Sequence, residues 1–332
     1  MRIIALVGAA LAVAACGGAG EQPAGPVRDP VRVVMLPFLG SVTMTVALEE
    51  GYFEEQNLEI EPVKLARNLE AVPALARGEV DVGIGQLTAN IVNAIAGGER
   101  LRLVAGSGFL DPDGCTYNAI MVRRQLVEQG RLDRPEQLRD LTVELDRLLP
   151  MAFFVDTLLE PSGLTIDDLD LVSLPVRANA DALINGSIDA TVVSEPLLSR
   201  IVASGEGVIW KPSEDIVPGY QLSSLMFGPN LLDERPEVGV RFLTAFLKAV
   251  RRFNEGRTPR NVELVAAHTG LEPALVEQLC WPSFDATGRL RPEGLMQFQS
   301  WLVSRGLIDE ALPQDELIDS RFIERAAAAV TE

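Results

Sequence analysis

The sequence contains a single histidine, His268, and only three cysteines among its 332 residues. One histidine excludes most histidine-based acid–base catalysis and most zinc sites. The sequence contains no G-x-S-x-G, C-x-x-C or H-E-x-x-H motif, and it also lacks the nucleotide-binding pattern G-x-x-x-x-G-K-[ST]. These absences argue against the common hydrolase, thiol-redox, metalloprotease and ATPase classes.

Basic residues are also scarce, with 29 Lys and Arg against 47 Asp and Glu and a net charge of −18. A surface of this sign repels phosphate backbones and anionic lipid headgroups. We therefore expect neither a nucleic-acid partner nor broad adhesion to membranes. With 332 residues, 47% of them hydrophobic, the chain is long enough to form two lobes.

Residues 3–15 form an apolar run after Arg2 that is too short to span a bilayer comfortably. Small residues precede Cys16, and a stretch rich in Gly and Pro follows it. The segment resembles a bacterial lipoprotein signal, in which cleavage precedes an acylated cysteine. An ordinary secretory peptide cleaved near the same place is the alternative. We expect a signal peptide over 1–15, lipid attachment at Cys16 and a flexible tether over 16–30.

The other two cysteines are Cys115 and Cys280. An oxidising compartment permits a disulfide between them, whereas two unpaired buried thiols fit the sequence equally well. The sequence leaves this question open.

Predicted strands alternate with predicted helices along the first two thirds of the chain, which indicates parallel βαβ units. Predicted strands cover 31–36, 58–65, 80–84, 101–105, 141–145, 169–174 and 188–193. Predicted helices cover 43–54, 68–75, 88–96, 151–159 and 179–186.

One motif occurs twice. The pattern Ala-Leu-x-x-Gly-x-(Val/Ile)-Asp begins at Ala74 and again at Ala182, 108 positions later. Upstream, 57–60 matches 168–171 at an offset of 111. Similar offsets in the same order predict two lobes of one topology, and the long period argues against a solenoid.

From residue 230 onward the pattern is helical, and 220–227 is predicted to be a strand that returns between the lobes. We therefore expect an α/β fold with two similar lobes, a hinge and a helical C-terminal tail. The expected division is 31–115 for the first part of lobe 1, 116–222 for lobe 2, and 223–332 for the return to lobe 1 and the tail.

Six segments, in their order along the chain, resemble the substrate-binding proteins of nitrate/sulfonate/taurine-type ABC transporters. These segments are 50–58, 75–85, 95–98, 163–169, 182–196 and 242–251. That family also includes binders of thiamine-precursor pyrimidines. The resemblance implies a type II periplasmic-binding fold whose cleft closes on a small ligand. It also implies an ABC permease and an ATPase as partners, no cofactor, a monomer, and a place on the extracytoplasmic face of a bacterial membrane.

In open α/β sheets, ligands bind beyond the carboxyl ends of the strands, where helix N-termini also point. Several candidates have a structural alternative: Thr88 and Glu195 can cap helices, Arg147 can pair with Asp146, and the loop at Phe38 can pack on the helix beneath it. The candidate ligand-binding residues in these loops are Phe38, Ser41, Gln86, Thr88, Arg147, Met151 and Glu195.

Bulky residues surround these candidates, namely Leu39, Leu148, Leu149, Pro150, Phe153 and Phe154. Apolar walls of this kind suit a ligand with an apolar or aromatic body, larger and less anionic than nitrate or taurine. Two other functions stay open. One is an enzyme like the pyrimidine synthases of this fold, although the chain lacks their cysteine cluster. The other is a binding module that serves a membrane sensor. Ligand identity and the choice between inner and outer membrane are not determined by the sequence.

Overall fold

The computed structural model describes residues 28–35, 38–63 and 71–331. The predicted signal peptide, Cys16, most of the tether, the ends of the strands predicted over 31–36 and 58–65, and the start of the helix predicted over 68–75 therefore lie outside the described residues. Within the described residues, no helix is both long enough and apolar enough to cross a bilayer.

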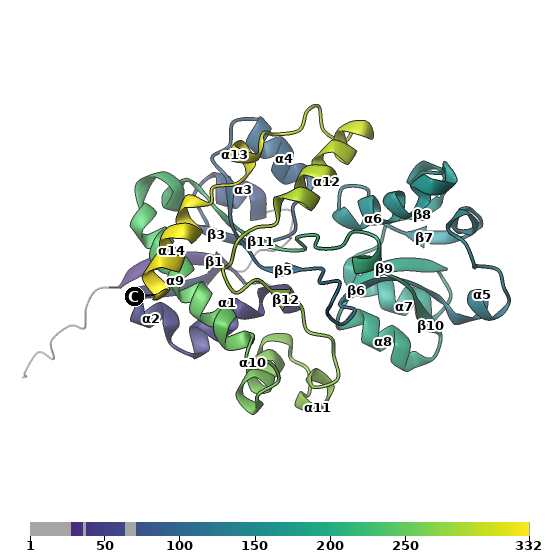
Figure 1. Cartoon of the computed structure of the whole chain (residues 1–332), viewed down its shortest axis with the longest axis horizontal. Helices are drawn as coiled ribbons and strands as arrows, with labels where there is room; N and C mark the ends of the chain where they lie inside the picture. Colours follow the sequence, from purple (N-terminus) through teal and green to yellow (C-terminus); the bar gives the residue numbers. More distant parts are fainter. Residues whose placement is uncertain (1–27, 36–37, 64–70, 332) are drawn as a thin grey trace, which may run out of the picture.

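The first lobe is built on a five-stranded sheet in the order β2-β1-β3-β11-β4 (Figure 1, left). β1, β2 and β3 run parallel, and β11 is antiparallel to both of its neighbours. Its strands are β1 (Asp29–Val34), β2 (Leu58–Val63), β3 (Val82–Gly85), β4 (Arg102–Gly106) and β11 (Ser224–Phe227).

The second lobe repeats this arrangement with a sheet in the order β8-β7-β9-β6-β10 (Figure 1, right). Here β7, β8 and β9 are parallel and β6 is antiparallel to its neighbours, so β6 takes the place of β11. Its strands are β6 (Asn118–Arg123), β7 (Thr142–Glu144), β8 (Asp170–Val172), β9 (Ala190–Ser194) and β10 (Gly207–Pro212). The predicted duplication of topology is confirmed.

The repeated motif performs the same task in both lobes. Asp81 accepts a hydrogen bond from the backbone N–H of Arg32 in β1 at 2.7 Å, and Asp189 accepts one from Thr142 in β7 at 3.2 Å. Asp81 is fully buried and also binds the side chains of Arg32, Asn230 and Arg235. Burial alone would raise the pKa of Asp81, but these hydrogen bonds hold it below the ordinary value.

The second sequence match, between 57–60 and 168–171, was placed two residues out of register. In the structure, Pro62 and Leu171 pair with Val33 and Val143, so the true offset in this strand is 109. A slip of two residues preserves the alternation of side chains between the two faces of a strand, and the sequence pattern could not detect it.

Helices cover both sheets, and one predicted helix is divided. The segment predicted as 43–54 forms two helices, because Gly51 adopts φ 74° between them. The helices before the tail are α1 (Val42–Glu49), α2 (Tyr52–Glu55), α3 (Ala71–Ala76), α4 (Ala89–Ala96), α5 (Arg124–Glu128), α6 (Pro150–Leu159), α7 (Asn179–Ile184) and α8 (Leu197–Ser204).

The C-terminal tail is attached to the first lobe. Ile318 forms a bridge with Leu103 of β4, and α14 packs against α9. The tail also contributes a strand, β12 (Ser283–Phe284), that pairs with β5 (Gly108–Phe109). Its helices are α9 (Pro236–Phe253), α10 (Pro259–Thr269), α11 (Pro273–Val276), α12 (Pro292–Ser304), α13 (Gln314–Leu317) and α14 (Arg321–Thr331).

Two chain segments join the lobes side by side. The side-chain amide of Gln221 in the returning segment donates to the carbonyls of Ser107 and Gly108 in the outgoing one, both at 3.1 Å. Next to this crossing, Cys115 and Cys280 form a disulfide, with their Cα atoms 5.7 Å apart. The question that the sequence left open is thus answered in favour of a bond between the crossing and the tail.

Candidate functional site

The loops at the carboxyl ends of the parallel strands face one another across the lobes and meet. The backbone N–H of Ala89, at the start of α4, donates to the carbonyl of Leu148 at 3.3 Å. Nearby, the Gln86 side-chain amide lies 3.9 Å from the Met151 sulfur. Gln86 follows β3 of the first lobe and Met151 lies in the first turn of α6 in the second lobe. Two of the predicted residues are therefore brought together from opposite lobes.

Hydrogen bonds fix the shape of the loop that follows β1. Ser41 is buried, and its hydroxyl donates to the carbonyl of Phe38 at 2.8 Å. The carbonyl of Gly40 accepts a hydrogen bond from Ser107 at 2.6 Å. Phe38 itself remains partly exposed. In this structure Ser41 thus shapes the loop, and Phe38 is the member of the pair that reaches the surface.

The only histidine also supports this loop. His268 in α10 places Nε2 2.9 Å from the Phe38 carbonyl and Nδ1 2.7 Å from the Thr45 hydroxyl. A carbonyl oxygen only accepts, so we assign the proton to Nε2, and Nδ1 then accepts from Thr45. Nε2 also lies 3.2 Å from Ser41 Oγ, but in this tautomer it has no lone pair with which to activate a serine. The contact is structural rather than a catalytic dyad.

His268 was not among the candidate site residues predicted from the sequence. No clear signal for this contact was present in the sequence, because Ser41 precedes the predicted helix and His268 lies 223 positions beyond Thr45.

Burial lowers the pKa of His268 below its ordinary value of 6.5, more than the Phe38 carbonyl raises it. The unfolded chain then binds a proton more readily than the folded chain, so the free energy of unfolding falls as the pH drops through 6.5. We expect a steeper fall for the wild type than for His268→Gln between about pH 7.5 and 5.5, by at most about 1.4 kcal/mol per pH unit. Urea unfolding at several pH values measures both slopes, and parallel slopes would contradict this expectation.

Thr88 and Arg147 adopt the structural roles considered as alternatives above, a helix cap and an ion pair. The partner of Arg147 differs from the one predicted. Thr88 caps α4 by accepting from the backbone N–H of Ile91 at 3.4 Å. Arg147 pairs with Asp167, 20 positions away, rather than with Asp146. Asp146 instead accepts from the backbone N–H of Leu148 at 2.9 Å. The Arg147 side chain stays 43% exposed, so its ion pair is screened by solvent.

Glu195 directly follows β9 and is buried. Its carboxylate accepts from the N–H and hydroxyl of Ser199, at 3.0 and 2.7 Å, and from the backbone N–H of Cys280 at 3.3 Å. Burial raises its pKa above the ordinary value although these donors act in the opposite direction. Glu195 therefore accepts from the first turn of α8 and contacts the tail.

Several residues predicted as apolar walls belong to the core. Leu39 and Phe154 are fully buried, and Phe153 is 7% exposed and packs on four aromatic rings. Pro150 is buried as well, so the prediction is corrected for these four residues. At the junction of the lobes, Phe38 and Met151 are partly exposed and Leu148 is 36% exposed.

The geometry can be compared with known proteins. The model of the NMT1-like family matches residues 24–269, well over half of the chain. The chain belongs to the NMT1-like family. A search of curated proteins gave no significant match.

Solved structures share the fold of this NMT1-like protein at low identity. The ligand-binding component of an ABC-type import system from Staphylococcus aureus, with zinc bound, aligns with a TM-score of 0.72 and 15% identity over 90% of this chain and 99% of that chain. The aliphatic sulphonate binding protein SsuA from Escherichia coli gives 0.68 and 17% over 87% and 97%. The desulfurization enzyme DSZB gives 0.65 and 17% over 91% and 99%.

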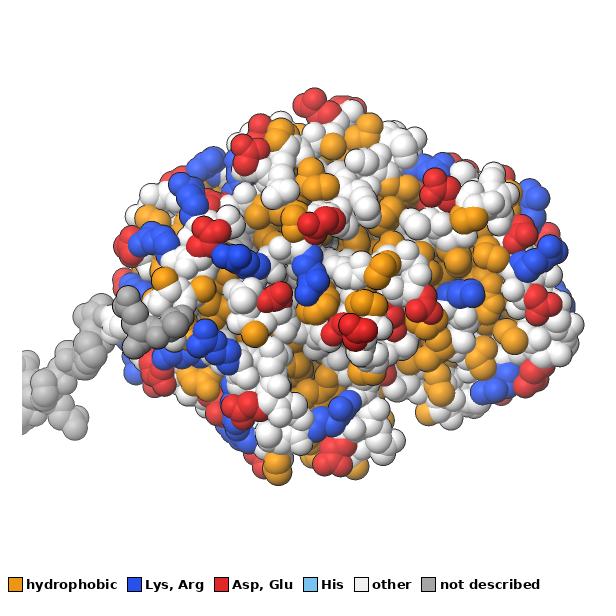
Figure 2. Space-filling model, in the orientation of Figure 1, with side chains coloured by type: hydrophobic (Ala, Val, Ile, Leu, Met, Phe, Trp, Pro, Cys, Tyr) orange, Lys and Arg blue, Asp and Glu red, His pale blue; other side chains and the backbone are white. Residues whose placement is uncertain are grey.

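Metal-binding side chains and surface charge are two features that bear on the site of this NMT1-like protein. Within the part of the chain that the structure describes, no three His, Cys, Asp or Glu side chains cluster closely enough to hold a metal ion. Acidic and basic side chains are interspersed over the face seen in Figure 2, with apolar ones between them. On that face the negative net charge is not gathered into one acidic patch.

Proposed function

We propose that this chain is the extracytoplasmic solute-binding component of an ABC importer. It captures a small organic molecule between its lobes and presents it to a permease driven by an ATPase. The observation that carries the proposal is the meeting of Gln86 and Met151 from two sheets of identical topology, at the carboxyl ends of their strands. The proteins of similar fold that bind ligands for ABC import support it.

The proposal includes the anchor and the division of the chain. Acylation at Cys16 would tether the protein to a membrane, and the mass of the purified mature N-terminus tests this directly. Lobe boundaries near residues 115 and 222 are consistent with the strand assignments, because each falls between a strand of one sheet and a strand of the other. One folded body with two lobes needs no second copy, so we propose a monomer.

The ligand we propose has an uncharged apolar or aromatic body with one polar group. Phe38, Leu148 and Met151 supply apolar surface at the junction, and Gln86 supplies an amide. The charged candidates are engaged within the chain, Arg147 by Asp167 and Glu195 by Ser199 and Cys280. A fully charged ligand would have to displace one of these partners.

A ligand panel tests this class. We expect heteroaromatic compounds, including pyrimidines, to raise the melting temperature, and taurine and nitrate to leave it unchanged.

Gln86→Ala should weaken binding about tenfold through loss of one hydrogen bond, without altering the melting temperature of the free protein. Calorimetry on both proteins measures the effect, and stabilisation by taurine or nitrate alone would sink the ligand assignment.

An enzyme on this fold is the second candidate, because one protein of similar fold is the desulfurization enzyme DSZB. The tautomer assigned to His268 argues against a serine–histidine dyad at Ser41. Mass spectrometry of the bound compound after incubation separates the two functions, since an enzyme releases a changed molecule. A role in sensing is distinguished by whether a permease or a sensor kinase co-purifies with the protein.

A further inference from the structure

The tail segment around α12 is fixed to the first lobe at both ends. At its start, the carbonyl of Gly288 accepts from the backbone N–H of Gly106, which ends β4, at 2.8 Å. At its far end, Asp319 donates its backbone N–H to the Leu103 carbonyl of β4 at 2.9 Å. Between these points α12 also packs on α4. The segment therefore moves with the first lobe.

From this position α12 reaches across to α6 of the second lobe. The ring of Phe153 lies 6.0 Å from those of Phe298 and Trp301, measured between centroids, and the latter two rings are stacked. Phe298 is fully buried, and Phe153 and Trp301 are less than a tenth exposed. Separation of the lobes at this point would expose all three rings to water.

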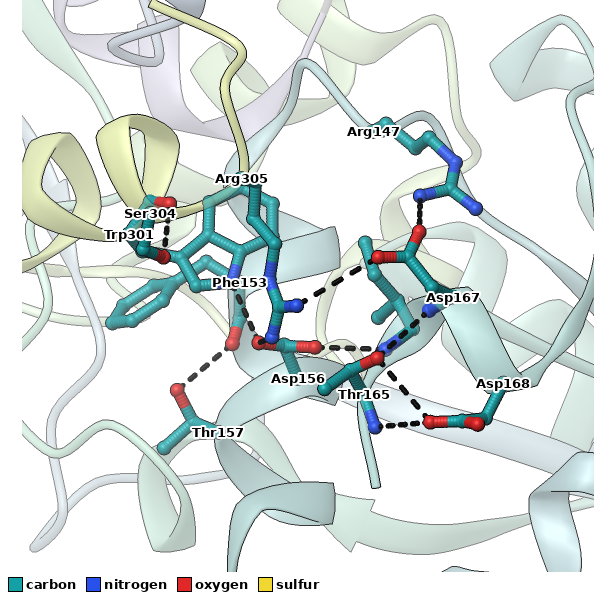
Figure 3. A network of polar contacts seen from close by, with 11 residues as sticks. Arg147, Phe153, Asp156, Thr157, Thr165, Asp167, Asp168, Trp301, Ser304 and Arg305 are labelled. Atoms are coloured by element: carbon teal, nitrogen blue, oxygen red, sulfur yellow. Dashed lines mark hydrogen bonds and ion pairs between the residues drawn. The ribbon is translucent and has the colours of Figure 1, made fainter. Parts of the chain in front are cut away.

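A buried carboxylate completes the contact (Figure 3). Asp156 of α6 accepts from the indole N–H of Trp301 at 2.8 Å and from the Arg305 guanidinium, and it also accepts from the backbone N–H of Ile166 at 2.8 Å. Its side chain is only 8% exposed, whereas both partners of the neighbouring Arg147–Asp167 pair are more than 40% exposed. Solvent therefore screens the outer pair more strongly than the contacts of Asp156, and Arg305 also lies 3.7 Å from Asp167 of the outer pair.

We propose that Asp156, Trp301 and Arg305 are positioning residues that hold α6 against the first lobe before a ligand arrives. The inference rests on the proposed function, since it takes Met151 at the start of α6 as part of the ligand site. A helix is stiff, and Met151 lies about 7.5 Å along the same helix from Asp156 at about 1.5 Å per residue. Fixing one end of α6 fixes the other.

The tail also contacts the second lobe at the end of β9. Cys280 donates its backbone N–H to Glu195 and is joined by its side chain to Cys115. The tail thus touches both cleft loops of the second lobe, at α6 and after β9. The ligand enters a site whose two lobes are already close together, and opening requires release at α12.

Distances between the lobes in the ligand-free protein test the proposal. Spin labels at the exposed positions 99 and 131, introduced as E99C and R131C, report one lobe each. We expect one short, narrow distance distribution for the otherwise wild-type protein. Arg305→Gln removes the cation and Trp301→Phe keeps an aromatic ring but removes the indole donor, so both should shift the distribution to longer distances. Arg305→Lys retains the charge and should restore the short distance.

The matched control is Glu237→Gln, which breaks the exposed Arg325–Glu237 pair within the first lobe and should leave the distances unchanged. With a ligand from the panel, we expect Arg305→Gln to release it about tenfold faster than Arg305→Lys does. Unchanged distances in both folded variants, Arg305→Gln and Trp301→Phe, would overturn the proposal. This result does not depend on any ligand, so failure of the ligand panel counts against the proposed function alone.

Discussion

Replacing Asp81 with Ala should lower the free energy of unfolding by about 3–5 kcal/mol, because it leaves several donors around a buried carboxylate without their acceptor. Asp81 is fully buried and accepts from Arg32 N at 2.7 Å, Asn230 Nδ2 at 2.7 Å and Arg235 Nη2 at 3.3 Å. Without the carboxylate, the Arg32 N–H and the Asn230 amide lose a buried acceptor. Urea unfolding followed by circular dichroism measures the loss.

The second lobe supplies the matched control. Asp189 holds the corresponding position, but its side chain is 23% exposed and pairs with one arginine, Arg123, at 3.2 Å. Asp189→Ala should therefore lower stability by only about 1 kcal/mol. Since the pKa of Asp81 lies below its ordinary value, the difference between wild type and Asp81→Ala should shrink as the pH falls through the folded pKa. Equal effects of the two substitutions at neutral pH would refute this account.

The same motif explains why the fold could be predicted from the sequence. Gly78 and Gly186 adopt φ values of 67° and 79°, a conformation that disfavours side chains. At Gly78 an added Cβ would also lie 2.7 Å from the side-chain oxygen of Asn230. Each glycine follows a helix, and each aspartate precedes a core strand and accepts from the backbone of the first strand of its lobe, so the same chemistry requires these residues at this spacing in both lobes. A requirement that occurs at the same spacing in both lobes is visible in a sequence as a repeated motif.

The site was less predictable because its contacts are long-range and are not repeated between the lobes. The sequence identified the right loops, since strand ends and helix starts are local features. It could not show that Arg147 pairs with Asp167, or that His268 supports Phe38 from 230 positions away. Nor could it separate a cleft wall from the core, because an apolar residue after a strand fits both. The burial of Phe153 is decided by α12, which lies more than a hundred residues further along the chain.

Two substitutions in α6 distinguish a core residue from a residue of the ligand site. The substitution of the core residue should cause the second large loss of stability that we expect. Phe154→Ala should lower the free energy of unfolding by about 3–5 kcal/mol, because Phe154 is fully buried and its ring lies 4.9 Å from that of Tyr220. Thermal and urea unfolding measure this loss. If Phe154 were a cleft wall, its removal would instead weaken ligand binding at nearly unchanged stability.

Met151→Ala is the matched variant, three residues earlier on the same helix. Met151 is partly exposed and faces Gln86 of the other lobe, so its truncation removes little core packing. We expect a stability loss of about 1 kcal/mol or less, together with weaker binding of any ligand held at this junction. Calorimetry at a temperature where both variants are folded compares their affinities. A reversal, with Phe154→Ala stable but unable to bind and Met151→Ala unstable but fully able, would place the ligand on the opposite side of α6.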